Sequence, residues 1–156
     1  MVSKAKWLLL PAIAVALSAC GLGTKLQPPA ASIQQLQVLP NGQWQLTLRV
    51  ENYSYDTGMH VYAMDADLEL GGRHAGHIHV APALDIPAMS ADIATAVIAP
   101  GAQARSALAD AKGHAVAYAL KGSISAGKGG DGKPQAFDLD GKDYLSPVPG
   151  VANTWR

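Results

Sequence analysis

The stretch "MDADLELGGRHAGHIHV", residues 64–80, decides the fold. Apolar residues alternate with acidic ones up to Leu70, and the alternation resumes after the glycine pair at positions 71 and 72. A period of two places successive side chains on opposite faces of a β-strand. Two adjacent glycines adopt the positive φ angles of a tight hairpin turn without strain. The stretch therefore predicts a β-hairpin with one apolar face and one polar face.

The same period of two recurs along most of the chain. It is clearest in "QWQLTLRV" (43–50), and in the strand before the glycine pair it places Tyr62 on the same inward face as Met64 and Leu68. Further runs of this kind are "HIHV" (77–80), "ADIATAVIA" (91–99), "AVAYALKGSI" (115–124) and "QAFDLD" (135–140).

One segment has a different character. "GAQARSALADA" (101–111) is alanine-rich and weakly amphipathic, follows Pro100 and ends near Gly113, which predicts one short helix. Half-buried strands that are joined by short turns favour an antiparallel arrangement with one solvated face. We therefore expect an all-β fold: an antiparallel β-sandwich of about seven strands, fibronectin-III- or immunoglobulin-like, with one short helix.

The first residues predict an export signal. Lys4 and Lys6 precede "WLLLPAIAVALSA" (7–19), an apolar run of thirteen residues that contains Pro11. A helix that spans a bilayer needs about 20 apolar residues, so this run is too short to serve as one.

Cys20, the only cysteine in the sequence, directly follows this run. Leu17–Cys20, "LSAC", resembles the lipobox of bacterial lipoproteins, which implies that the Cys20 thiol carries a diacylglycerol and that Cys20 becomes the mature N-terminus. Two or three acyl chains anchor a protein durably, whereas one chain is marginal. Gly21, rather than Asp, follows; by resemblance to lipoprotein sorting in Gram-negative bacteria this implies the outer membrane. The alternative is an ordinary signal peptide followed by an unmodified, apolar cysteine.

These features divide the chain into four parts. Residues 1–19 are expected to be a lipoprotein signal peptide, 20–32 a lipidated tether, 33–146 the sandwich and 147–156 a C-terminal tail. The formal net charge is zero and charged residues are 15% of the chain, which favours neither nucleic acid nor an acidic surface as a partner.

The order of motifs resembles the late-embryogenesis-abundant type 2 family (WHy domain, desiccation-related). The runs "SIQQLQVLPNGQWQLTLRVEN", "MDADLELGGRHAGH", "DIPAMSADIATAVI", "YALKGSISAG" and "FDLDG" follow one another over about residues 30–145. The positions that match the family pattern are Asn52, Gly72, Gly76, Pro87, Gly122 and Gly141. The resemblance implies a fibronectin-III-like β-sandwich without catalytic residues. One departure is Tyr53, which follows Asn52 where the family usually has Pro, so the properties of that turn are not transferred.

Three histidines, His74, His77 and His79, raise the question of a metal site. On a strand, His77 and His79 project from one face, where two imidazoles at this spacing can share Zn²⁺ or Cu²⁺, and His74 can reach them from the turn. Further ligands would come from the acidic residues of the facing strand, Asp65, Asp67 or Glu69. The simpler interpretation is the solvated polar face of an amphipathic hairpin. We prefer it, and expect neither a metal nor another cofactor.

Residues 127–134, "GKGGDGKP", fit the Gly-x-x-x-x-Gly-Lys pattern of a phosphate-binding loop. Pro134 stands where that motif requires Ser or Thr, and a strand pattern follows where a helix N-terminus would hold phosphate. We therefore expect a hairpin loop that binds no nucleotide.

The sequence as a whole predicts a non-enzymatic lipoprotein of the outer membrane, facing the periplasm, with a stress-protective or binding role. It contains no Gly-x-Ser-x-Gly motif, and its one cysteine is expected to be acylated. One alternative is an accessory module that binds a protein partner in an envelope complex. A second alternative is a periplasmic metal-binding domain that uses His77 and His79.

Overall fold

The computed structural model of the chain describes residues 25–111, 113–130 and 132–156. The strands are β1 (Ala30–Val38), β2 (Trp44–Asn52), β3 (Met59–Leu70), β4 (Arg73–Val80), β5 (Leu84–Ile86), β6 (Ser90–Ile98), β7 (Val116–Lys128), β8 (Gln135–Leu145) and β9 (Thr154–Trp155). Seven of them have eight or more residues, and β5 and β9 are short. The expected helix is α1 (Ala102–Asp110).

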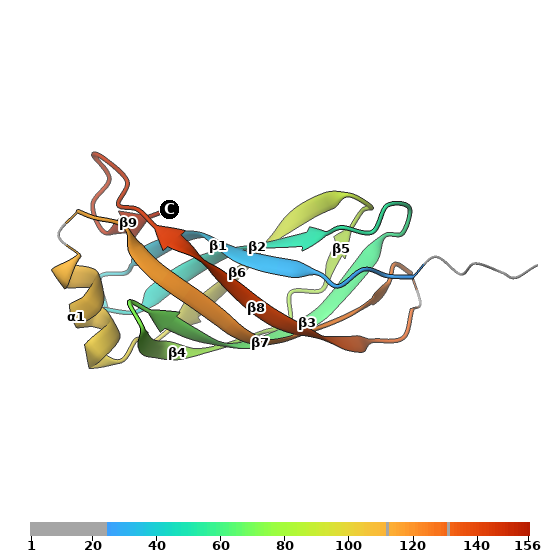
Figure 1. Cartoon of the computed structure of the whole chain (residues 1–156), viewed down its shortest axis with the longest axis horizontal. Coiled ribbons are helices and arrows are strands. Elements are labelled where there is room, and N and C mark those ends of the chain that lie inside the picture. The colour runs from blue at the N-terminus through green and yellow to red at the C-terminus, as the bar shows by residue number, and fades with distance from the viewer. Residues whose placement is uncertain (1–24, 112, 131) are drawn as a thin grey trace, which may run out of the picture.

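The strands form two antiparallel sheets. Sheet A has the order β6-β2-β1-β9, and sheet B has the order β4-β3-β7-β8, with β5 pairing with the start of β3. Figure 1 shows the two sheets packed against each other, with α1 at one end and the first described residues leaving from the opposite end. The arrangement confirms the predicted β-sandwich with one short helix.

The apolar sides of the alternating strands meet between the sheets. The predicted inward residues of β2, from Trp44 to Val50, are all buried, as are Met64 and Leu68 of β3. The expectation for Tyr62 is wrong. A β-bulge between Val61 and Ala63 shifts the pairing of β3 with β7, and such a bulge changes which residues face the core. Val61 is therefore buried, while the half-buried Tyr62 donates its hydroxyl hydrogen to the Gly132 carbonyl oxygen, 2.7 Å away.

One buried side chain connects the two sheets directly. Tyr118 of β7 reaches across the core, and its hydroxyl oxygen accepts a hydrogen bond from the Ile33 backbone N–H of β1, at 3.0 Å. Ile33 lies at a β-bulge, so the side chain satisfies a donor at an irregularity of the ladder. Burial is the main cause that raises the pKa of Tyr118 above its usual value. This hydrogen bond links sheet B to sheet A across the core.

The sandwich extends beyond the bounds that the sequence predicts. β1 begins at Ala30, and Leu26, within the predicted tether, is already part of the core. At the other end the predicted tail contains β9, which pairs with β1 through Leu36↔Trp155. Trp155 packs against the core, which explains why these last residues join sheet A.

The predicted signal peptide, Cys20 and the tether up to residue 24 lie outside the described residues. Within the described ranges, no helix has the length and apolar character needed to cross a bilayer.

Candidate functional site on the outer face of sheet B

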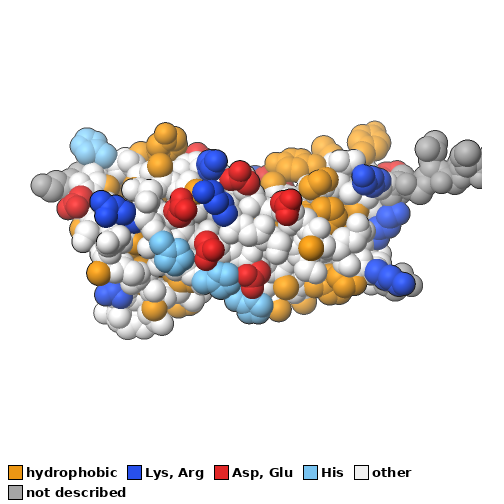
Figure 2. All heavy atoms as spheres, turned by 60° about the horizontal axis from the view of Figure 1, so that its bottom comes forward, with side chains coloured by type: hydrophobic (Ala, Val, Ile, Leu, Met, Phe, Trp, Pro, Cys, Tyr) orange, Lys and Arg blue, Asp and Glu red, His pale blue; other side chains and the backbone are white. Residues whose placement is uncertain are grey.

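The outer face of sheet B carries three rows of mostly polar side chains, which we call the charged face. Each row crosses β4, β3, β7 and β8 in that order, because the strands pair in register. The rows are His79–Asp65–Ser123–Asp138, His77–Asp67–Lys121–Asp140 and His74–Glu69–Ala119–Lys142. In Figure 2 histidine, acidic and basic side chains gather together on this side of the molecule. The charged face therefore has contributions from segments more than sixty residues apart in the sequence.

Two histidines and two aspartates form a continuous chain of contacts within the charged face. His79 Nδ1 lies 2.8 Å from Asp65 Oδ2, and the other oxygen of Asp65 lies 2.9 Å from His77 Nε2. His77 Nδ1 in turn lies 3.0 Å from Asp67 Oδ1. The turn at Gly71 and Gly72, both with positive φ, begins the hairpin, and the β-bulge between Leu68 and Glu69 shifts its register by one residue so that both histidines lie opposite aspartates. The predicted pairing of these histidines with the acidic side of β3 is therefore observed.

The environment of His77 favours its protonated form. A neutral imidazole has one N–H donor, whereas both ring nitrogens of His77 face a carboxylate oxygen, which only an imidazolium satisfies fully. The hydrogen bond with Asp67 is the largest cause that raises the pKa of His77 above its usual value of 6.5. Reciprocally, the hydrogen bond with His79 lowers the pKa of Asp65 below 3.8. All these groups are exposed to solvent, so the interactions adjust charge more than they stabilise the fold.

The histidines do not converge on a common point as metal ligands do. Within the described residues, no group of three or more His, Cys, Asp or Glu side chains has an arrangement that holds a metal ion. The ring nitrogens of His77 and the Nδ1 atom of His79 are directed at carboxylates. His74 pairs with Glu69 beyond a β-bulge. Metal binding would require these side chains to exchange their present contacts for the ion.

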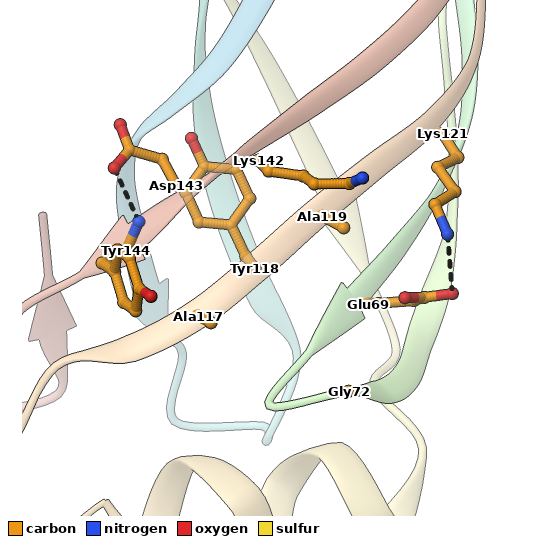
Figure 3. A pocket seen from close by; sticks show the side chains of 9 residues that line it. All are labelled: Glu69, Gly72, Ala117, Tyr118, Ala119, Lys121, Lys142, Asp143 and Tyr144. Atoms are coloured by element: carbon orange, nitrogen blue, oxygen red, sulfur yellow. Dashed lines mark hydrogen bonds and ion pairs between the residues drawn. The ribbon is translucent and has the colours of Figure 1, made fainter.

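A shallow pocket of about 430 Å³ adjoins the charged face (Figure 3). Ala117 and Ala119 leave space on β7, and the exposed Tyr144 forms one side. Lys121 lies 3.8 Å from the Glu69 carboxylate, so its charge is partly compensated. A pocket this shallow is suited to receive one side chain of a partner protein, and less suited to enclose a substrate.

Buried polar side chains in the described ranges are structural. They are Asn52, Ser54 and Thr154. Asn52 lies at the end of β2, and its amide nitrogen lies 2.8 Å from the Thr57 carbonyl oxygen, 3.2 Å from that of Ile86 and 3.1 Å from that of Pro87. This residue thereby holds the loop after β2 against the loop after β5.

Sequence reasoning missed half of the charged face. Lys121, Asp138, Asp140 and Lys142 lie on the polar sides of strands that were predicted, so alternation indicates that they face outward. It does not indicate that they continue the rows that begin at His77 and His79. Residues 127–134 contain the β7–β8 hairpin loop, as expected, and β8 follows directly instead of a helix.

No protein-family model matches this chain, and no curated protein matches it in sequence. Among solved structures, a protein from Arabidopsis thaliana is similar, with a TM-score of 0.51 and 14% identity over 83% of this chain and 88% of that one. A protein from Archaeoglobus fulgidus has a TM-score of 0.43 and 12% identity over 80% of this chain and 100% of that one. The likeness to the Arabidopsis protein concerns the β-sandwich fold alone.

Proposed function

We propose that this protein is a non-enzymatic lipoprotein of the outer membrane, whose β-sandwich faces the periplasm and has a stress-protective or binding role. The observation that carries the anchor is the sequence Leu17–Cys20, preceded by an apolar run and two lysines. The resemblance to the late-embryogenesis-abundant type 2 family supports the protective role.

The positions that carry this resemblance have structural explanations. The Asn52 amide joins two loops, and Gly72 has a φ of +73° in the hairpin turn. A Cβ atom on Gly122 would collide with the backbone of Asp65 and Ala66, and one on Gly141 would lie 2.8 Å from the Ala31 carbonyl oxygen. Backbone geometry requires these residues, so they support a role that depends on the shape of the domain and not on a catalytic group.

The charged face supports binding as the mode of action. Its exposed acidic, basic and histidine side chains are mostly paired with one another. Such pairs are easily exchanged for contacts with the polar groups of another protein, because each exposed pair contributes little by itself. We therefore assign the charged face as the surface that contacts envelope proteins under stress.

The anchor is tested with Cys20→Ala in a Gram-negative host. We expect the native chain to fractionate with the outer membrane and to show a lipid-modified N-terminal cysteine by mass spectrometry. The variant should lose both properties. A native chain that is freely soluble with an unmodified thiol would refute the anchor.

Protection is tested by drying a reporter enzyme with the protein and measuring recovered activity. The double variant Asp65→Asn with Asp67→Asn should protect less well, while Thr95→Ser on the outer side of sheet A serves as a matched control. Protection no greater than that given by an equal mass of an inert protein would exclude a general protective role.

The alternative function is that of an accessory module in an envelope complex, and the pocket beside Tyr144 favours it. Crosslinking in intact envelopes distinguishes the two: one stoichiometric partner indicates a module, and diffuse recovery indicates general protection. The metal hypothesis is tested separately. If it is correct, zinc or copper raises the melting temperature, and the double variant His77→Ala with His79→Ala abolishes the rise.

A further inference from the structure

One end of the sandwich is held close to the proposed lipid anchor. Leu26 is buried in the core, and the Gln27 backbone N–H donates a hydrogen bond to Ser54 Oγ at 2.9 Å, so the chain is part of the folded domain from this point. Cys20 precedes Leu26 by six residues. Even fully extended, six residues span only about 20 Å. A lipid on Cys20 therefore keeps this end of the sandwich near the bilayer surface.

The same end exposes large apolar side chains. Tyr53 and Tyr55, in the loop after β2, are 52% and 87% exposed, and Met89, in the loop before β6, is 62% exposed. Tyrosine has an apolar ring and a polar hydroxyl, and it is enriched where a membrane meets water. Met89 has a φ of +52°, a conformation that side chains rarely adopt, and yet presents its side chain to solvent. Such an exposed residue is not explained by the packing of the core.

The loops that carry these residues are tied to one another. The Met89 N–H donates to the Ser54 carbonyl oxygen at 3.0 Å, and the Gly129 N–H of the β7–β8 loop donates to the Gly58 carbonyl oxygen at 2.7 Å. Asn52 joins the first two loops through the contacts given above. The apolar side chains therefore stand on a preformed surface, and binding does not require the loops to become ordered.

Three lysines at this end suit anionic headgroups. Lys25, Lys128 and Lys133 are exposed around the apolar residues, Asp56 and the exposed Asp85 are acidic neighbours, and Glu51 accepts a hydrogen bond from the Tyr53 hydroxyl at 2.9 Å. In Figure 2 apolar and basic side chains lie together toward the end from which the N-terminal trace leaves. Lysine side chains beside interfacial aromatic residues bind negatively charged lipid and keep their stems in the apolar layer.

We propose that Tyr53, Tyr55 and Met89, with Lys25, Lys128 and Lys133, form a membrane-contact surface that rests on a phospholipid headgroup layer. The proposal depends on the lipid anchor at Cys20 proposed above. It predicts that the sandwich stands on its loop end, so that α1 points away from the bilayer and the charged face is turned sideways, accessible to proteins in the periplasm.

The test uses the full lipidated chain in vesicles of phosphatidylethanolamine and phosphatidylglycerol. Because Cys20 is the only native cysteine and is blocked by lipid, Tyr55→Cys accepts a single environment-sensitive fluorophore. Ala109→Cys, at the exposed end of α1, is the matched control. We expect a blue-shifted emission that lipid-borne quenchers reduce at position 55, and water-like emission at position 109. Adding Tyr53→Ser and Met89→Gly should reduce the shift at position 55.

The possible failures are distinguishable. Mass spectrometry that shows an unmodified Cys20 overturns the anchor and this proposal together. A lipidated chain that stays on vesicles, with water-like emission at position 55, overturns the membrane contact and leaves the anchor intact. A blue shift that requires added envelope proteins, and is not seen with vesicles alone, also overturns it, because a protein would then cover this surface.

Discussion

The outer faces of the two sheets differ sharply although their inner faces are alike. Sheet B presents histidine, aspartate, glutamate and lysine in the rows of the charged face. Sheet A presents mainly glutamine, serine and threonine, together with Ile93 and Val97, and one ion pair between Arg49 and Glu51 at 2.6 Å. We call this second surface the neutral face. Both satisfy the requirement that a sheet in a sandwich be apolar inside and wettable outside.

The difference shows that solubility alone does not explain the charged face. Glutamine and threonine keep most of the neutral face hydrated without charge. On sheet B, oppositely charged side chains are placed opposite each other across strands, as in Asp67↔Lys121 and Lys121↔Asp140. This arrangement avoids like charges in direct opposition. It also places histidines, whose charge changes near neutral pH, beside carboxylates, whereas the strands of sheet A contain no histidine.

The largest expected effect is that of Gly122→Ala, which disrupts the backbone pairing of β3 and β7 on which the charged face depends. The added Cβ would collide with Asp65 and Ala66, so β3 and β7 must separate. Overpacking of this kind costs about 1–3 kcal/mol, and we expect the upper part of that range because the colliding atoms are backbone. Urea denaturation measures the loss, with the neighbouring Ser123→Ala as a control within about 0.5 kcal/mol. Equal unfolding midpoints for Gly122→Ala and the native chain would contradict the close approach of these strands.

A smaller loss of stability is expected for Asn52→Ala, at the end of the sandwich where loops from both sheets meet. The substitution leaves the carbonyl oxygens of Thr57, Ile86 and Pro87 without their side-chain donor. A buried group that loses its partner costs about 1–3 kcal/mol. Thermal unfolding measures the effect, and Gln45→Ala on the neutral face should leave the transition unchanged. If Asn52→Asp, which cannot donate, were as stable as the native chain, the role of this amide would be wrong.

The pH response should distinguish the two faces directly. The pKa of His77 is raised, so its contribution to stability is complete below pH 6.5 and is lost as pH rises through the folded-state value. The pKa of Asp65 is lowered, so its contribution is complete above pH 3.8 and is lost as pH falls through the folded-state value. Both groups therefore contribute fully to stability between pH 3.8 and pH 6.5.

NMR titration of the His77 ring provides the measurement. We expect a pKa above 6.5, and a decrease in Asp67→Asn because that carboxylate is the largest cause of the shift. Asp92→Asn on β6, the edge strand of sheet A, should not change the titration. A His77 curve that is the same with and without the Asp67 carboxylate would refute the electrostatic description of the charged face.

The smallest effects are expected on the neutral face itself. Ile93 and Val97 are about half exposed, so replacing each with Thr removes little buried apolar area. We expect changes within about 0.5 kcal/mol in chemical denaturation and an unchanged sedimentation coefficient. A clear loss of stability, or a change in assembly state, would show that another molecule covers this face in solution.

The alternation of apolar and polar residues predicts most of the fold but loses accuracy at irregularities. The inward positions of β2, the Gly71–Gly72 turn and α1 follow from local patterns, because period, turn chemistry and helix boundaries are properties of neighbouring residues. Tyr62 was assigned to the wrong face because a bulge depends on how β3 meets β7. β9 has two residues, too few to show a period.

The sequence alone determined which side of most strands faces water, and it placed the histidines and the acidic residues on the polar sides of two strands joined by a glycine turn, because period and turn chemistry are local properties. The turn alone would place His77 opposite Ala66 and His79 opposite Met64; the β-bulge between Leu68 and Glu69 shifts both histidines to the aspartates. Only the tertiary structure decided that β7 pairs with β3 and extends these rows with Lys121, and with Asp140 through the β7–β8 hairpin, since β3 and β7 are about fifty residues apart and are aligned by the packed core and not by a turn. It also decided that the loops carrying Tyr53, Tyr55 and Met89 meet, through the hydrogen bond from the Met89 N–H to the Ser54 carbonyl oxygen. That juxtaposition arises where three loops between the strands pack together.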